Sequence, residues 1–367
     1  EFCPQTADLD FLPLDDYVRR TEVLAFEPAG VLSARVPMLT PYINALRLIA
    51  DLSNLARVDR RAAKVIDDGG YDVAFVHDCQ LAQNPPVLRY LNTQSVYYCH
   101  HGARSRLPRL SRPQKNWLQE IKRAYYTLPR RFYPRLRESR AAQNIRSADQ
   151  VLTNSYFACE ALFRTYGVTS RVCYLGVDTD QFKPMNLQRE PFVLSVGSLT
   201  DVKGYPFLLR ALGSLPQADR PPLVIAANSA DPRERALIED LAHDLAVTLT
   251  IRRLNDDDEL VRLYNRAAAF AYTPIMEPLG LVALEAMACG TPMVAVREGG
   301  LRETVLHQET GLLVDRDEDA FATALQHVLK DQAYARRLGR NAAEHMPANW
   351  SWDRTVDQLE QELTKGR

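Results

Sequence analysis

Short apolar segments alternate with helical patterns through the middle and C-terminal parts of the chain. The first series of expected strands is Val73–His77, Ser95–Cys99, Gln150–Thr153 and Arg171–Tyr174. The second series is Phe192–Val196, Leu223–Ala227, Val247–Ile251, Ala268–Tyr272 and Met293–Val296. Helical spacing of apolar residues recurs in Phe207–Leu215, Pro232–His243, Asp256–Ala267 and Asp319–Leu329. This alternation predicts an α/β protein whose parallel sheets are covered by helices on both faces.

The two series of strands are separated by the polar segment Gly176–Glu190, which we interpret as a linker between two domains. The length of 367 residues also suits two domains better than one core. We expect the first domain over residues 1–184 and the second over residues 185–349. Near the start, Tyr42–Asp67 has the pattern of one or two helices, and no strand with a glycine-rich turn is recognisable before it.

Composition narrows the possible function classes. Apolar residues make up 46% and charged residues 25%, which is typical of a soluble globular protein. The net charge of −1 provides no overall field that would attract nucleic acid. Six cysteines without a CxxC pair favour reduced thiols in a cytosolic protein over a disulfide framework. No apolar run reaches about 18 residues and no signal peptide is recognisable, so we expect no membrane-spanning helix. Because Glu1–Leu12 does not resemble a protein start, we expect a fragment or a processed form.

The segment Arg104–Arg146 departs from this charge balance, with thirteen Lys and Arg residues, two acids and several interleaved aromatic residues. One interpretation is a solvated helical surface. The other is contact with an anionic membrane surface or with a phosphate-bearing acceptor, since basic residues are attracted to anionic lipid. Nucleic acid is less favoured because no recognised binding motif accompanies the segment.

The most informative segment is Glu277–Gly290, which follows an expected strand. We expect Glu277 in a loop and Glu285 about one turn into a helix that Gly290 ends. The N-terminus of this helix offers unpaired N–H groups to an anion, and these belong to Gly280, Leu281 and Val282. A carboxylate at Glu285 suits paired sugar hydroxyls and one at Glu277 suits a hexose. The alternative is an amphipathic helix with two surface glutamates, but the apolar character of the helix favours burial.

Two further segments supply candidate cations. Gly197 lets the chain turn at the carboxyl end of a strand, and the loop that follows, which includes Ser198, carries Lys203 as a point charge for a diphosphate. A solvated lysine is the alternative, and the spacing is not that of a Walker loop. His100 or His101 ends an earlier strand, where an imidazole can donate to a sugar hydroxyl or phosphate or serve structurally. His77–Asp78 is a weaker version of the same arrangement, and no metal-ligand spacing is present.

Together these motifs resemble the retaining glycosyltransferases of GT-B fold known as family 4. The resemblance covers about Ser147 to Trp352. It is carried by Asn154-Ser-Tyr-Phe, Tyr174-Leu-Gly-Val-Asp178, Gly197…Lys203-Gly204, Glu277…Glu285, Gly299-Gly300…Glu303, Thr310-Gly311-Leu-Leu-Val and Trp350-Ser-Trp352, with Tyr97-Tyr-Cys-His100 further upstream. It implies two facing Rossmann-like domains, with the acceptor on residues 1–184 and the nucleotide-sugar on residues 185–349. Residues 350–367 would form a helix that packs back on the first domain.

The resemblance also implies roles for individual residues. Lys203 and the helix N-terminus at Gly280–Val282 would neutralise the leaving diphosphate, with Gly197 and Ser198 also in the donor site. Glu285 would bind the ribose, Glu277 the donor sugar hydroxyls, and His100 the sugar or the β-phosphate. The implied reaction moves a hexose from a UDP- or GDP-linked donor to a glycan or lipid-linked acceptor in polysaccharide biosynthesis. No cofactor or divalent metal is expected, and the implied location is cytoplasmic, with peripheral contact at the inner face of the membrane as a further expectation.

Two departures from the family pattern keep alternatives open. Ser198 stands where the family usually has Arg, and the glycine-rich loop after the first strand is not found, so one interpretation is an incomplete N-terminal domain. A catalytically impaired GT-B-fold binding protein, or a GT-B nucleotide-sugar enzyme of other chemistry, is therefore an alternative. Retention through a covalent intermediate would need Glu277 as nucleophile. The family leans toward attack on the face that the phosphate leaves.

Overall fold

The computed structural model describes residues 2–4, 18, 21–26, 28, 40–79, 81–100, 133–229, 231–254 and 256–365. The chain divides into two compact units. The N-terminal unit comprises Glu1–Thr153, Ala161–Arg171 and Lys365–Arg367, and the C-terminal unit comprises Asn154–Glu160 and Val172–Thr364.

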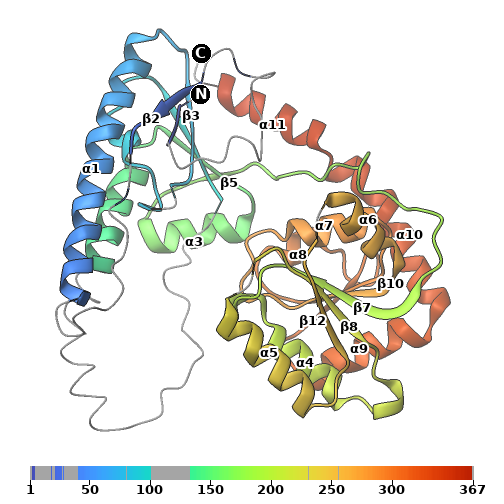
Figure 1. Ribbon diagram of the computed structural model, residues 1–367. Helices are drawn as coiled ribbons and strands as arrows, with labels where there is room; N and C mark the ends of the chain where they lie inside the picture. Colours follow the sequence, from blue (N-terminus) through green and yellow to red (C-terminus); the bar gives the residue numbers. More distant parts are fainter. Residues whose placement is uncertain are drawn as a thin grey trace. The chain divides into compact units, whose positions relative to one another are not determined.

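The N-terminal unit is built on a parallel four-stranded sheet in the order β3-β4-β5-β6 (Figure 1). Its strands are β3 (Ala74–His77), β4 (Ser95–Cys99), β5 (Gln150–Thr153) and β6 (Arg171–Val172). Every residue of the central strand β4 is buried, as expected for a strand covered on both faces. The helical elements are α1 (Thr40–Asp68), η1 (Pro86–Arg89), a helix over 133–146, and α3 (Tyr156–Tyr166), whose first residues belong to the C-terminal unit.

The N-terminal unit differs from the sequence prediction in three places. The segment predicted as one or two helices is the single helix α1. Two short strands, β1 (Phe2–Pro4) and β2 (Glu22–Leu24), pair in parallel and were not predicted, because three residues are too few to show a period. The strand expected to reach Tyr174 ends at Val172. The backbone N–H of Tyr174 instead donates to the side chain of Gln358, at 3.3 Å.

The C-terminal unit contains a parallel six-stranded sheet in the order β12-β11-β10-β7-β8-β9. Its strands are β7 (Glu190–Val196), β8 (Leu223–Ala226), β9 (Leu249–Arg252), β10 (Ala267–Tyr272), β11 (Met293–Val296) and β12 (Leu312–Val314). Its helices are η3 (Asp201–Lys203), α4 (Tyr205–Ser214), η4 (Gln217–Asp219), α5 (Pro232–Asp244), α6 (Asp257–Arg266), α7 (Leu281–Ala288), α8 (Leu301–Thr304), α9 (Glu318–Lys330), α10 (Gln332–Asn349) and α11 (Trp352–Thr364). Helices α4, α5 and α9 lie on one face of this sheet, and α6, α7 and α10 lie on the other (Figure 1). The predicted α/β class with helices on both faces is therefore confirmed.

The strand order of this sheet fixes where a ligand is expected. From β7 the chain proceeds outward through β8 and β9, then returns to the other side of β7 as β10 and proceeds through β11 to β12. The order thus reverses between β7 and β10, whose backbones are paired in parallel. In open α/β sheets, ligands bind outside the carboxyl ends of the strands at such a reversal. The loops that follow β7 and β10 are therefore the first place to look for a site.

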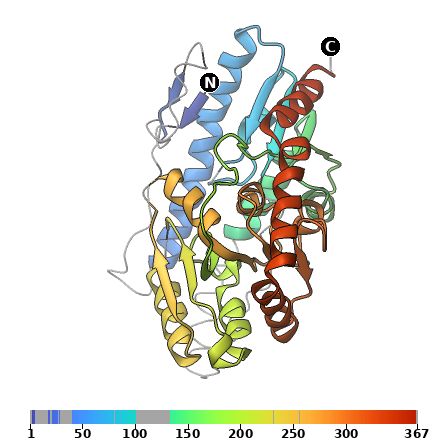
Figure 2. The same ribbon diagram turned by 90° about the vertical axis from the view of Figure 1, so that its right-hand side faces the viewer.

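The segment interpreted as a linker is part of the C-terminal unit. Val177 and Phe182 are buried in its core, which also contains Trp350 near the end of α10. Helix α11 follows α10 directly (Figure 2), and its Gln358 side chain donates to the carbonyl of Val172 at 2.8 Å. The first part of this segment is therefore held by packing and hydrogen bonds, whereas residues 183–188 are exposed.

Two sequence predictions fall partly outside the described residues. Of the basic segment Arg104–Arg146, only 133–146 is described, and this part is helical. His101 also lies outside the described residues. Within the described ranges, no helix combines the length and the apolar character that crossing a membrane requires. The free cysteines include Cys79, Cys99, Cys159, Cys173 and Cys289.

Candidate functional site

The connection from β7 to α4 holds Lys203 close to the end of β10. Gly197 has φ +147°, and its carbonyl accepts a hydrogen bond from the Tyr205 hydroxyl at 2.8 Å. Gly204 adopts the left-handed region with φ +71°, and a Cβ there would lie 2.0 Å from the carbonyl oxygen of Thr273. Only glycine fits this conformation and this close approach. The motif Lys203-Gly204 therefore fixes the lysine beside the loop that follows β10.

Lys203 and Glu277 form an ion pair in which Nζ and Oε2 are 2.9 Å apart. Their side chains are only 18% and 15% exposed, so water screens the pair less than it screens a surface salt bridge. The Tyr272 hydroxyl lies 3.4 Å from the same Nζ, and this tyrosine is buried at the carboxyl end of β10. The structure thus brings together two of the predicted catalytic residues at the reversal between β7 and β10.

The loop that carries Glu277 is held by a pair of glycines. The N–H of Gly300 donates to the carbonyl of Glu277 at 2.8 Å. A Cβ on Gly299 would lie 2.2 Å from that carbonyl oxygen, and a Cβ on Gly300 would lie 2.0 Å from the carbonyl oxygen of Pro278. The Gly299-Gly300 motif therefore supports the Glu277 loop by close backbone contact, which larger residues would prevent.

Arg316 fastens the start of the same loop. Its guanidinium donates to the carbonyls of Thr273 and Pro274 at 3.2 and 2.6 Å, and to both carboxylate oxygens of Glu298 at 2.7 and 2.9 Å. The planar fork of arginine suits this double arrangement. Sequence reasoning did not find Arg316, because the partners that define its role lie 18 to 43 residues away in the chain.

Helix α7 begins directly after Gly280, which has φ +90°. The first N–H groups of a helix lack intrahelical acceptors, so those of Leu281 and Val282 point out of its N-terminal end. The Leu281 side chain is exposed, and the rest of the helix is largely buried. Glu277 precedes the helix in the loop and Glu285 lies inside it, as the sequence predicted.

Glu285 is a carboxyl group in an apolar setting. Its Oε2 accepts a hydrogen bond from the Tyr264 hydroxyl at 2.8 Å. Burial raises the pKa of Glu285 to about 7, although the bond from Tyr264 favours the ionised form. Burial and the nearby carboxylates, Glu277 first and Glu285 after it, also raise the pKa of Tyr272, so this phenol lies within electrostatic reach of both acids. Perturbed carboxyl groups of this kind cluster at functional sites.

Other predicted residues take positions that support the site or lie apart from it. The Ser198 hydroxyl lies 3.4 Å from the Thr200 hydroxyl. Because a serine is uncharged, this position supplies no cation to the site. Glu303 accepts the N–H groups of Tyr156 and Phe157 at 2.9 and 2.8 Å, and the Tyr174 hydroxyl at 2.9 Å. It therefore caps the first turn of α3, a role that its motif did not reveal.

His100 lies in the N-terminal unit, in a cluster at the ends of β3 and β4. His77 Nδ1 and His100 Nε2 are 3.2 Å apart, and the two rings are stacked. Asp78 accepts the backbone N–H of His100 at 2.9 Å and the Tyr97 hydroxyl. Burial lowers the pKa of His77. The two strand-end histidines are thus one cluster, which the sequence treated as two separate motifs.

Known protein families match both halves of the chain. The family described as Glycosyl transferases group 1 matches residues 177–345, and the family described as Glycosyltransferase Family 4 matches residues 20–181. The chain belongs to the group 1 glycosyl transferases, and its two Rossmann-like units have the GT-B fold.

Curated relatives agree with this family. An uncharacterized glycosyltransferase of Methanocaldococcus jannaschii is 32% identical over 210 residues, which is 53% of this chain and 53% of the relative. A D-inositol 3-phosphate glycosyltransferase of Rhodococcus jostii is 34% identical over 249 residues, which is 62% of this chain and 54% of the relative. The chain spans about half the length of these relatives.

Solved structures show the same fold. The sucrose-phosphate synthase of Thermosynechococcus elongatus has a TM-score of 0.69 and 24% identity, over 95% of this chain and 84% of that one. The Anabaena protein HepE in complex with UDP has a TM-score of 0.70 and 19% identity, over 99% of this chain and 91% of that one.

Proposed function

We propose that the protein is a retaining glycosyltransferase that moves a hexose from a UDP- or GDP-linked donor to a glycan or lipid-linked acceptor. The observation that carries the proposal is the pair of Lys203 and Glu277, 2.9 Å apart at the strand reversal and followed by the N-terminus of α7. Cation, carboxylate and unpaired N–H groups at one place suit a nucleotide diphosphate joined to a sugar. HepE, which has the same fold, was solved with UDP-glucose, which favours a UDP-linked donor here.

The proposed donor binds along the edge defined by β7, β10 and α7. Lys203 and the N–H groups at the start of α7 receive the diphosphate, since both are attracted to negative charge. Glu285 accepts hydrogen bonds from the ribose hydroxyls. Glu277 accepts hydrogen bonds from the hydroxyls of the sugar, and its pairing with Lys203 places the cation between carboxylate and phosphate.

The same pairing favours a front-face reaction over a covalent one. In the front-face route the bond from the anomeric carbon to the phosphate oxygen breaks, and the acceptor oxygen bonds on the same face. The acceptor proton passes to the leaving phosphate oxygen, so no protein nucleophile is needed. Glu277 is a weak candidate nucleophile because Lys203 already neutralises it. Lys203 and the α7 dipole stabilise the charge that develops on the leaving diphosphate.

Metal independence is part of the proposal, because Lys203 and α7 supply the positive charge that a divalent ion would otherwise bring. Transfer measured with EDTA is expected to equal transfer measured with added Mg²⁺. A loss of activity in EDTA that Mg²⁺ restores would refute this part.

We also propose cytoplasmic location with peripheral contact to anionic membranes through Arg104–Arg146, as the charge of that segment suggests. Charge reversal at Arg130 and Arg131 should release the protein from anionic vesicles, and higher salt should do the same. Equal binding to neutral vesicles would contradict this contact.

A donor screen tests the proposed activity. The full chain is incubated with UDP-, GDP- and ADP-sugars, and the released nucleotide and sugar are measured together with the configuration of the product. Lys203→Ala should lower the rate by orders of magnitude. Lys330→Ala is the matched control, since Lys330 also forms a lysine–carboxylate pair but is 60% exposed on α9. Nucleotide binding without hydrolysis or transfer of any donor would favour the impaired binding protein instead.

A further inference from the structure

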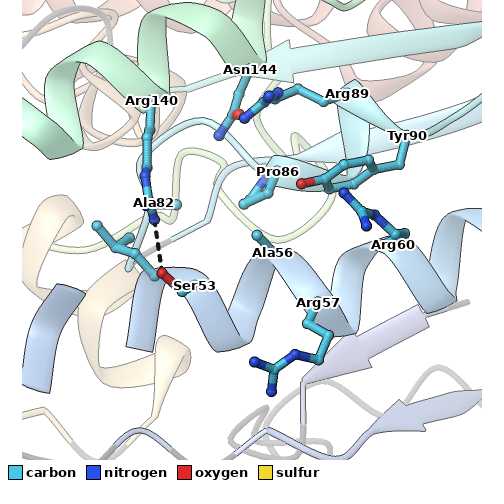
Figure 3. A pocket seen from close by; sticks show the side chains of 11 residues that line it. Ser53, Ala56, Arg57, Arg60, Ala82, Pro86, Arg89, Tyr90, Arg140 and Asn144 are labelled. Atoms are coloured by element: carbon cyan, nitrogen blue, oxygen red, sulfur yellow. Dashed lines mark hydrogen bonds between the residues drawn. The ribbon is translucent and has the colours of Figure 1, made fainter. Parts of the chain in front are cut away.

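The N-terminal unit contains a cavity of about 320 Å³ whose lining includes none of the residues of the candidate site. It is bounded by α1, by the segment around η1 and by the helix over 133–146 (Figure 3). Four arginines from these three elements line it: Arg57 and Arg60 from α1, Arg89 from η1, and Arg140 from the helix over 133–146. Figure 3 shows Arg60, Arg89 and Arg140 beside the cavity, whereas the Arg57 side chain points away from the other labelled side chains. Residues far apart in the sequence therefore bring three positive charges to one opening, with a fourth arginine at its edge.

Among the residues that the structure describes, the hydrogen bonds and ring contacts of these arginines are with neutral groups. Arg57 donates to Asn54 at 3.2 Å and Arg140 to the Ser53 hydroxyl at 3.4 Å, both neutral partners. The guanidinium groups of Arg60 and Arg89 lie 4.8 and 5.8 Å from the centre of the Tyr90 ring. Within the described part of the chain, none of the four forms an ion pair with a carboxylate. Like charges gathered in this way repel one another and attract anions.

Asp59, the acidic residue next to Arg60 in the sequence, accepts a hydrogen bond from another segment. Asp59 accepts the backbone N–H of Val87 at 2.9 Å, and burial raises its pKa to about 6. This bond ties α1 to η1, so it fixes the element that carries Arg89 beside the helix that carries Arg57 and Arg60. Asp59 therefore positions the arginines, and it does not line the cavity.

The cavity is distinct from the histidine cluster of the same unit. Arg89 and Tyr90 precede β4, which begins at Ser95, and Asn144 precedes β5, which begins at Gln150. They lie in the segments that lead into the amino ends of these strands. His77 and His100 lie at the carboxyl ends of β3 and β4, where ligands of parallel sheets normally bind. A ligand in the cavity would thus not occupy the expected place of the acceptor.

We propose that this cavity is a second anion site, which binds a diphosphate or bisphosphate group. Guanidinium forks match phosphate oxygens bidentately, and the three of Arg60, Arg89 and Arg140 suit the charge of two linked phosphates. The volume is at the lower end of small-molecule sites, which fits a phosphate group rather than a whole nucleotide sugar. Leu52, Ala56 and Pro86 add an apolar lining for the carbon atoms that carry the phosphates. Such a group can come from a soluble metabolite or from a lipid headgroup.

Titration of the full chain with inorganic pyrophosphate tests the site by calorimetry. Arg60→Gln with Arg89→Gln should weaken binding at least tenfold, since each charge-assisted hydrogen bond contributes strongly. Arg57→Gln with Arg140→Gln is a second pair, in case the loss of the Tyr90 contacts impairs folding. Arg61→Gln with Lys64→Gln is the matched control, because both residues are exposed on α1 and neither lines the cavity. The control pair should change affinity by less than twofold.

Two results would overturn the proposal. One is an equal loss of pyrophosphate affinity in the two double variants of cavity arginines and in the Arg61→Gln, Lys64→Gln control, which would indicate general attraction by the positive charge of this surface. The other is that Lys203→Ala abolishes pyrophosphate binding while both double variants of cavity arginines bind as the wild type does. This would place the anion in the donor site. Vesicles with and without cardiolipin then distinguish the sources. Release of the cavity variants from cardiolipin vesicles assigns the site to a lipid headgroup, and unchanged vesicle binding assigns it to a soluble phosphate.

Discussion

Glu285→Gln should stabilise the C-terminal unit at neutral and alkaline pH while it impairs donor binding. The Glu285 carboxyl titrates near 4.5 when exposed to water, and burial raises its pKa to about 7 in the folded protein. Between these values the unfolded chain loses its proton before the folded chain does. Stability therefore falls as pH rises from about 4.5 to about 7, and the loss is complete above that range.

The change in unfolding free energy follows from the rise in the pKa of Glu285. Each pKa unit corresponds to 1.36 kcal/mol, so the full loss is about 3 kcal/mol in unfolding free energy. Glutamine keeps an acceptor for the Tyr264 hydroxyl and cannot ionise. The gain is smaller than the full loss, because the amide must also be buried. The variant and the wild type should thus converge near pH 4.5 and diverge by up to about 3 kcal/mol at pH 8.

Urea unfolding at several pH values measures this, followed by tryptophan fluorescence in a Trp117→Phe background, so that Trp350 and Trp352 of the C-terminal unit give the signal. Glu239→Gln is the control, because Glu239 is half exposed and pairs with Arg235 on the same helix. Its unfolding midpoint should follow the wild type at every pH. Parallel pH curves for Glu285→Gln and the wild type would refute the reasoning. In the same samples, UDP affinity should fall about tenfold or more in Glu285→Gln, because a charge-assisted acceptor is lost.

The other predictions concern the support of the site. Arg316→Ala should lower the unfolding free energy by about 2 kcal/mol or more, because it leaves Glu298 and two loop carbonyls without their donor. Arg316→Lys should not restore this stability. Urea unfolding measures the difference, and an unchanged unfolding free energy in Arg316→Ala would contradict the prediction. Gly300→Ala should lower activity more than tenfold, because the new Cβ would displace the loop that carries Glu277. The φ of −71° at Gly300 suits any residue, so the loss would come from this close contact and not from backbone strain. A fully active variant in the donor screen would show that Gly300 does not support the loop. His100→Ala should reduce transfer at least tenfold and leave UDP affinity within twofold, and an equal loss of both would assign His100 to nucleotide binding.

Much of the fold could be predicted from the sequence because most strands are short and largely apolar. The observed β4 and β11 coincide with the predicted segments, and every residue in them is buried. The short pair β1 and β2 gave no periodic signal. The polar segment Gly176–Glu190 resembled a linker because its few apolar residues, such as Val177 and Phe182, are widely spaced. Their burial depends on tertiary packing that composition does not report.

The candidate site was predictable where one local segment carried both the geometry and the chemistry. Glu277, Gly280 and Glu285 lie along one loop and one helix, so their order could be inferred from helix signals. The partners that lie between segments were missed. Tyr272 was read only as the end of a strand, and its place beside Lys203 depends on the pairing of β7 with β10. Tyr264 likewise was missed, because its hydrogen bond joins a residue of α6 to Glu285 of α7, 21 residues further along the chain.

A calorimetric titration with UDP tests the central claim, that the reversal between β7 and β10 binds the nucleotide part of the donor. The full chain should bind UDP, and Lys203→Ala should weaken that binding at least tenfold through loss of a charge-assisted contact. Lys330→Ala, which removes an equivalent charge from an exposed ion pair, should bind within twofold of the wild type. The account would be contradicted if neither UDP nor GDP bound the wild type, or if Lys203→Ala left the nucleotide affinity unchanged.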